Sequence, residues 1–259
     1  MSSEPLGLTN LLRYFKMVFG QELDHYFKGP PDTKLAVLGD ISLRVEDTYC
    51  LDGPDWLHDN LIEFYLEYLR HEKYREHKDK IEIIGPPVTQ CIKLAGSPDV
   101  VSEMIDPLNL ATKRVVLIPV NNSAQENAEG THWSLLAMVP PSQVFVHIDS
   151  LDMNKDHAEQ IAKVLSKHFG FKDPTYENYT KNQQSNAYDC GVYVLINARK
   201  VIEHFLETNT REGLVPEQKT NIQPFRQIIL GTIKEVATAQ QLATPGVTFT
   251  EGQEDVKEP

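Results

Sequence analysis

Cysteine is scarce in this chain, and that scarcity excludes several classes of protein. The 259 residues include only Cys50, Cys91 and Cys190, which lie far apart and form no CxxC pair. No cluster of cysteine and histidine has the spacing of a zinc site, so the sequence predicts no metal centre and no other cofactor. An odd, sparse set also argues against a disulfide framework and is typical of a reducing compartment.

Long apolar runs and an excess of basic residues are also missing. No apolar stretch approaches the roughly 20 residues that a membrane-spanning helix needs, and the N-terminus has no secretory pattern. The formal net charge of -12 argues against nucleic acid as the main partner. We therefore expect a soluble cytoplasmic and/or nuclear protein with no membrane or nucleic-acid partner.

The hydrophobic pattern divides the chain into three parts. Residues 1–37 are predicted to form a helical extension, because leucine and phenylalanine recur at helical spacing before a Gly-Pro-Pro break. Residues 38–240 are expected to form the folded domain. Residues 241–259, which carry glycine, proline and acidic residues, are expected to be a disordered acidic tail.

Within the folded domain, apolar periodicity predicts helices before and after a group of strands. Strands are expected over 115–120, 133–139 and 144–149, and their short links favour neighbouring positions in one sheet. Helices are predicted over about 58–70, 155–169, 190–205 and 222–240. Asn154 is expected to cap the second of these helices. This order of elements is typical of the α+β class.

Cys190 lies between an aspartate and a glycine at the start of an apolar run long enough to be a buried helix. Because a helix N-terminus stabilises negative charge, a cysteine there gains thiolate character, and the thiolate is the reactive form. Gln184 lies six residues upstream and could donate its side-chain amide to an oxyanion. The structural alternative is a small buried cysteine.

His132 opens one predicted strand and Asp149 ends the next. Antiparallel neighbours bring the start of one strand beside the end of the other, so these two side chains can meet. With Cys190 they predict a Cys-His-Asp arrangement for acyl transfer. The alternatives are a hydrogen-bonded histidine and a turn-capping aspartate. His147 and Asp149 resemble a metal pair, but no third ligand lies at useful spacing.

These motifs together resemble the ubiquitin-like-protein proteases (Ulp, or sentrin-specific proteases), which cleave after the C-terminal Gly-Gly of ubiquitin-like modifiers. The resemblance rests on His132-Trp133, Asp149 and Gln184-x-Asn186-x-x-Asp189-Cys190-Gly191. It covers about residues 40–238. It implies a papain-like cysteine-protease-type fold, with a central mixed sheet flanked by helices and the nucleophile at the N-terminus of a buried helix.

Several further runs resemble the small deneddylases, which act on the Nedd modifier attached to cullins. These runs are Pro54-Asp55-Trp56-Leu57, Val88 to Lys93, Lys113 to Val116 and Gly130 to Leu136. The resemblance implies a monomeric cysteine isopeptidase for Nedd conjugates such as cullins, and for the modifier precursor. SUMO stays open as the alternative modifier.

Carried over by position, the resemblance implies a role for each motif residue. Cys190 is the nucleophile, His132 the general base and acid, and Asp149 its orienter. Gln184 belongs to the oxyanion hole.

Three other positions are implied to bind the substrate. Trp56 and Trp133 would line a narrow tunnel over the Gly-Gly tail of the modifier. Asp59 would meet an arginine of that tail, and it lies in a stretch from Asp40 to Glu67 that is rich in carboxylates. That stretch is either a solvated face or a docking surface for basic residues. His58 departs from the family, which commonly has asparagine there.

Two alternatives from other functional classes stay open. Bacterial effector acetyltransferases share the catalytic arrangement but transfer an acyl group to an acceptor other than water, and the tunnel tryptophans argue against that class. A modifier-binding module that has lost activity is the non-enzymatic alternative. The complete catalytic set argues against it.

Overall fold

The structure is a computed structural model, and it describes residues 26–95, 97–125, 130–180, 184–208, 210–216, 222–240 and 248–249. The helix predicted within residues 1–25 lies outside these ranges. So does nearly all of the predicted acidic tail. No helix within the described ranges is long and apolar enough to cross a membrane.

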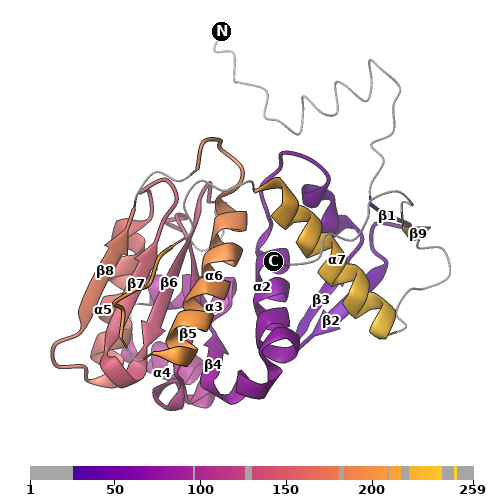
Figure 1. The fold of residues 1–259 in the computed structure, drawn as a ribbon. Helices are drawn as coiled ribbons and strands as arrows, with labels where there is room; N and C mark the ends of the chain where they lie inside the picture. The colour runs from indigo at the N-terminus through magenta and orange to yellow at the C-terminus, as the bar shows by residue number, and fades with distance from the viewer. Residues whose placement is uncertain are drawn as a thin grey trace, which may run out of the picture.

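A mixed sheet forms the centre of the described fold, with the strand order β4-β5-β6-β7-β8 (Figure 1). The strands are β4 (Ile81–Ile83), β5 (Val115–Asn121), β6 (Trp133–Val139), β7 (Val144–Ile148) and β8 (Thr175–Tyr179). β6 is antiparallel to β5 and to β7, whereas β4 and β8 run parallel to their neighbours. The three strands predicted from the sequence are therefore adjacent, as expected.

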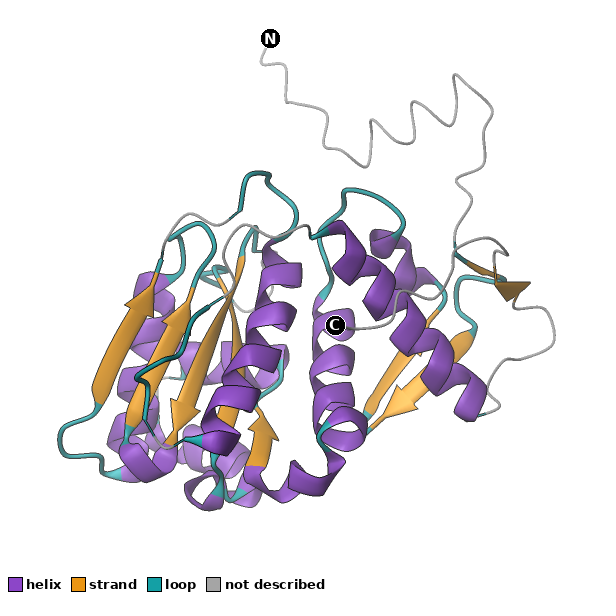
Figure 2. Cartoon of the chain, viewed as in Figure 1, coloured by secondary structure: helices purple, strands orange, loops and turns teal. Residues whose placement is uncertain are grey.

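Helices cover both faces of this sheet (Figure 2). They are α2 (Asp59–Tyr68), α3 (Pro86–Leu94), α4 (Pro98–Ile105), α5 (Lys155–Phe169) and α6 (Cys190–Glu207). Alternate residues of β5 point to opposite faces. Leu117 belongs to the core that contains α6, and Val116 to the core that contains α5. Because both of their faces are buried, β5, β6 and β7 read as nearly continuous apolar runs.

A hairpin of β2 (Lys34–Leu38) and β3 (Ile41–Arg44) packs against α2 and against α7 (Gln223–Ala239). The boundary predicted between residues 37 and 38 therefore falls inside β2. Phe27, Leu35 and Ala36 are buried in the same core as α2. The folded domain thus begins earlier than predicted, because these few apolar side chains fill its core without forming a helical stripe.

The described part of the tail also departs from the predicted disorder. β1 (Phe27–Lys28) pairs in antiparallel fashion with β9 (Thr248–Phe249). Two residues of the predicted disordered tail thus form a short strand.

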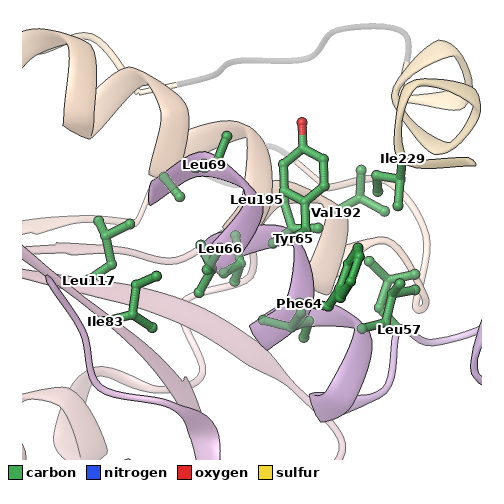
Figure 3. Close-up of a cluster of buried hydrophobic side chains, with 14 of the residues drawn as sticks. Leu57, Phe64, Tyr65, Leu66, Leu69, Ile83, Leu117, Val192, Leu195 and Ile229 are labelled. Atoms are coloured by element: carbon green, nitrogen blue, oxygen red, sulfur yellow. The ribbon is translucent and has the colours of Figure 1, made fainter. Parts of the chain in front are cut away.

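The core between α2, α6, α7 and the sheet is built from large aliphatic and aromatic side chains (Figure 3). Leu66 and Tyr65 of α2 and Leu195 of α6 are fully buried there. α6 also packs closely on β6 and β5. This packing fixes the start of α6 relative to the central strands.

We expect Leu66→Ala to lower the free energy of unfolding by about 2–5 kcal/mol, because it leaves a cavity in this core. Leu94→Ala is the matched control, since Leu94 is 40% exposed at the end of α3. Urea unfolding followed by circular dichroism would measure both changes. Equal destabilisation by the two substitutions would contradict this description of the core.

Candidate active site

Cys190 is the first residue of α6 and is only 2% exposed. The residue after it must be small: a Cβ at Gly191 would lie 2.9 Å from the Cβ of Leu57. A glycine therefore lets α6 begin close to the segment that precedes α2. Its N-terminal N–H groups favour negative charge at Cys190.

His132 directly precedes β6, and Asp149 directly follows β7. The antiparallel register pairs Leu135 with Ile148, which places the start of β6 beside the end of β7. His132 Nε2 lies 2.6 Å from Asp149 Oδ1, and both side chains are buried. The structure brings these two residues together, as the strand order predicts.

Asp149 is held as an anion by a ring of donors. Its Oδ1 accepts the backbone N–H of Leu151 at 2.9 Å, and its Oδ2 accepts those of Met153 at 2.8 Å and Asn154 at 2.7 Å. Burial raises the pKa of Asp149, but the hydrogen bonds and the charge of His132 outweigh it and hold the pKa well below its usual range. The carboxylate is therefore charged and fixed in position.

Cys190 lies beside the ring of His132 and contributes to raising the pKa of that ring. Because Asp149 engages Nε2, Nδ1 is the ring nitrogen left for the thiol. Burial lowers the pKa of His132, but the hydrogen bond to Asp149, the proximity of Cys190 and the negative charges of both outweigh burial, and the pKa rises to about 9. The histidine is thus poised as an imidazolium beside the sulfur.

Asn154 forms hydrogen bonds with both His132 and Asp149. It occupies the predicted N-cap position of α5, but its side chain does not cap the helix. Its Nδ2 donates instead to the carbonyls of Val120 at 2.9 Å and His132 at 3.3 Å, and to Ser134 Oγ at 3.1 Å. Its own backbone N–H holds Asp149, so the residue joins both strand ends.

His147 lies in the same buried network and is fully engaged. Its Nδ1 donates to Asn178 Oδ1 at 2.6 Å, so its Nε2 accepts the hydroxyl of Ser134 at 2.9 Å. Burial lowers the pKa of His147 and keeps the ring neutral. Within the described ranges, no group of three or more histidine, cysteine and acidic side chains could hold a metal ion.

Gln184 is anchored at both ends of its side-chain amide. Its Oε1 accepts the hydroxyl of Ser150 at 2.8 Å, and its Nε2 donates to the carbonyl of Asn186 at 2.7 Å. The second amide hydrogen has only a 3.5 Å contact with Asn186 Oδ1. Gln184 thus links the nucleophile segment to the loop after Asp149.

A groove of about 540 Å³ has Cys190 in its lining, together with Trp56 and Trp133. Trp56 is 46% exposed, and its Nε1 donates to the carbonyl of Ala187 at 2.6 Å. Trp133 is the first residue of β6 and is partly buried. The structure thus places both tryptophans on the groove that leads to the cysteine.

Asp59 is the first residue of α2 and lines the same groove. It is exposed there, and its Oδ1 accepts the backbone N–H of Asn60 at 2.9 Å. Other carboxylates of the acidic stretch are held by residues that lie farther away in the chain. Asp47 accepts hydrogen bonds from the backbone of Arg44 and from Asn60, and Asp52 accepts one from the backbone N–H of Tyr26. The acidic stretch is therefore not one uniform surface.

Two further segments complete the groove. The start of α3 contributes Pro86, Pro87 and Gln90, and the segments on either side of the β5–β6 connection contribute Asn121 and Thr131. Gln90 and Thr131 lie in runs that carry the family resemblance. Pro86, Pro87 and Asn121 carry no catalytic chemistry, so only their proximity in the fold identifies them.

Comparison with protein-family models matches residues 55–240 to the Ulp1 protease family, C-terminal catalytic domain. The chain therefore belongs to the Ulp1 protease family of cysteine proteases. Sentrin-specific protease 8 of Homo sapiens is 36% identical over 178 residues, which cover 68% of this chain and 84% of that protein. NEDD8-specific protease 1 of Arabidopsis thaliana is 37% identical over 178 residues, which cover 67% and 77%.

Among solved structures, the fold resembles that of the C-terminal Ulp1 protease domain in complex with Smt3, the yeast ortholog of SUMO. The TM-score is 0.63 at 19% sequence identity, over 79% of this chain and 88% of that chain. The fold class predicted from the sequence, a mixed sheet flanked by helices, is confirmed.

We expect the ring of His132 to titrate near pH 9 in the folded protein, above its ordinary pKa of 6.5. Protonated His132 then stabilises the fold, fully below about pH 6.5 and no longer once the pH passes about 9. NMR of isotope-labelled imidazole rings would measure the midpoint. Asp149→Asn should lower it, because the negative charge is lost.

The ring of His71, which lies in the π-helical segment Leu69–Lys73 directly after α2, serves as the control in the same spectra. Its pKa is lowered by burial and should be unchanged by Asp149→Asn. A midpoint of His132 near 6.5 in the unmodified protein would contradict the description of this pair.

Proposed function

We propose that this chain is a cysteine isopeptidase that cleaves after the C-terminal Gly-Gly of a ubiquitin-like modifier, with NEDD8 as the preferred modifier. The observation that carries the proposal is the buried hydrogen bond between His132 and Asp149 beside Cys190, on a groove with tryptophans in its lining. The higher identity to a NEDD8-specific protease than to SUMO proteases supports the choice of modifier.

In the proposed first step, the thiolate of Cys190 attacks the carbonyl carbon of the terminal glycine. The carbonyl electrons move onto oxygen, and the backbone N–H of Cys190 and the side-chain amide of Gln184, which exchanges its 3.5 Å contact with Asn186 Oδ1 for the substrate, stabilise this oxyanion. When the oxyanion collapses, the C–N bond breaks and the imidazolium of His132 gives its proton to the leaving amine. A thioester between the cysteine and the modifier results.

In the second step, water hydrolyses the thioester. Neutral His132 accepts a proton from water through Nδ1 as the oxygen attacks the thioester carbon. The C–S bond then breaks, which restores the thiolate beside protonated His132 and releases the modifier as a carboxylic acid that loses its proton to solvent. Asp149 stays ionised throughout, because it orients the imidazole and stabilises its charged form.

The groove explains why a Gly-Gly tail would be selected. Flat indole walls from Trp56 and Trp133 leave room for residues without side chains and exclude larger ones. Asp59 offers an exposed carboxylate to an arginine of the tail, where a charge-assisted hydrogen bond adds affinity.

The proposal also extends to partners and location. Cullin conjugates as substrates, processing of the modifier precursor and a monomeric state follow from the resemblance to deneddylases. The sparse cysteines support a reducing cytoplasmic and/or nuclear compartment.

The modifier can be identified by labelling. NEDD8, SUMO and ubiquitin, each with a C-terminal electrophile, would be incubated with the full chain and with Cys190→Ala. We expect NEDD8 to label the unmodified chain at least about tenfold faster than the others, a difference of roughly 1.4 kcal/mol, and Cys190→Ala to remain unlabelled and inactive. Faster labelling by SUMO would overturn the choice of modifier, and full activity in Cys190→Ala would overturn the mechanism.

The role of Asp59 can be tested by kinetics. We expect Asp59→Ala to raise KM for a fluorogenic modifier amide about two- to fivefold with little change in kcat, because an exposed charge pair contributes modestly to binding. Glu103→Ala, which removes an exposed carboxylate from α4, is the matched control. If both substitutions raise KM equally, the effect reflects net charge rather than a contact of Asp59.

A further inference from the structure

Arg226 is a buried arginine whose contacts converge on the active site. It lies in α7 and is only 1% exposed. Its Nε and Nη2 donate to Oδ1 of Asp189 at 3.1 and 2.8 Å. Its Nη1 donates to the carbonyl of Cys50 at 2.7 Å, and its Nη2 to the carbonyl of Asp55 at 2.8 Å. One guanidinium therefore joins α7 to two other segments of the chain.

Asp189 is the N-cap residue of α6 and directly precedes Cys190. An aspartate in this position ordinarily accepts the first backbone N–H groups of its helix. Here its side chain does not cap α6. Oδ1 is held by Arg226, and Oδ2 accepts Nδ2 of Asn186 at 2.7 Å. The pair thus keeps the carboxylate away from the amides that an oxyanion or thiolate needs.

The same arginine connects the groove wall to the nucleophile segment. The carbonyl that it holds belongs to Asp55, which directly precedes Trp56. Trp56 in turn donates to the carbonyl of Ala187, three residues before Cys190. The guanidinium also lies 5.9 Å from the ring centroid of Tyr188. The position of the tryptophan relative to the cysteine is therefore fixed by this set of contacts.

We infer that Arg226 is a positioning residue for Cys190: it neutralises Asp189, holds that carboxylate off the N-terminus of α6 and fixes Trp56 relative to the nucleophile. The inference rests on the proposed catalytic role of Cys190. Only arginine offers several donors in a rigid planar fork, so lysine can replace the charge but not the set of bonds.

The positive charge of Arg226 and the planar arrangement of its N–H donors have separate effects on Cys190. The charged groups around Cys190 are His132 and Asp149 from the strand ends, Asp189 and Arg226 beneath the helix start, and His58 and Asp59 on the groove. An unpaired anion beside a thiol disfavours the thiolate, and an unpaired cation favours it. Loss of each partner of the pair should therefore move the reactivity of Cys190 in opposite directions along the pH scale.

Alkylation by iodoacetamide tests the charge without any modifier. Its rate at Cys190, read by mass spectrometry of that peptide in the full chain, would be measured as a function of pH. We expect Arg226→Met to shift the midpoint of the alkylation rate to higher pH, by about half a pH unit to one pH unit. Asp189→Asn should shift the midpoint to lower pH by a similar amount. The double variant should return close to the unmodified profile, because both charges are gone.

Steady-state kinetics tests the role of the planar arrangement of guanidinium donors. With the fluorogenic modifier amide, we expect Arg226→Lys to keep the pH profile but to lower kcat about tenfold, since the charge stays and the geometry is lost. Arg70→Met is the matched control, because Arg70 also pairs with a buried carboxylate, that of Glu82 on β4. It should reduce stability and leave kcat unchanged.

Two results would overturn the inference. One is a folded set of variants, by circular dichroism, whose pH profiles and kcat match those of the unmodified chain. The other is a shift in the same direction for Arg226→Met and Asp189→Asn, which would show general damage to the fold. If Arg226→Met does not fold, Asp189→Asn and Arg226→Lys decide the matter alone. An inactive Cys190→Ala with unaffected Arg226 variants would leave the proposed function standing.

Discussion

The antiparallel pairing of β6 with β7 is the constraint on which the active site depends. It places the start of one strand beside the end of the other, and so brings His132 within 2.6 Å of Asp149. α6 packs across β6, which sets the N-terminus of that helix, and Cys190 with it, beside the imidazole. The catalytic groups thus lie at the ends of helices and strands, where rigid backbone fixes their positions.

Buried charge in this region is tolerated because each anion has several donors. Asp149 accepts hydrogen bonds from three backbone N–H groups besides its bond with His132. Asp189 accepts hydrogen bonds from the side chains of Arg226 and Asn186. An unpartnered buried carboxylate would be costly or would take up a proton. The network therefore serves stability and chemistry together: the bonds that make burial tolerable also fix the orientation of the reacting groups.

Long elements were predictable from the sequence, and short ones were not. The apolar stripe of α5 has a clear helical period over 15 residues, and β5, β6 and β7 are unbroken apolar runs with short links between them. α3, α4, β4 and the β2–β3 hairpin are too short for a period to stand out. β8 is half-buried and polar, and its pairing with β7 comes from the fold rather than from its own pattern.

The sequence by itself determined the catalytic residue types, their order along the chain and the topology that lets them meet, because motifs and apolar periods are local properties. Only the tertiary structure decided which buried groups support them. Asn154 has the sequence pattern of an ordinary cap, and Arg226 that of a helix residue far from the cysteine. Their partners lie tens of residues away along the chain, and only the packing of α5 and α7 against the rest brings them into contact.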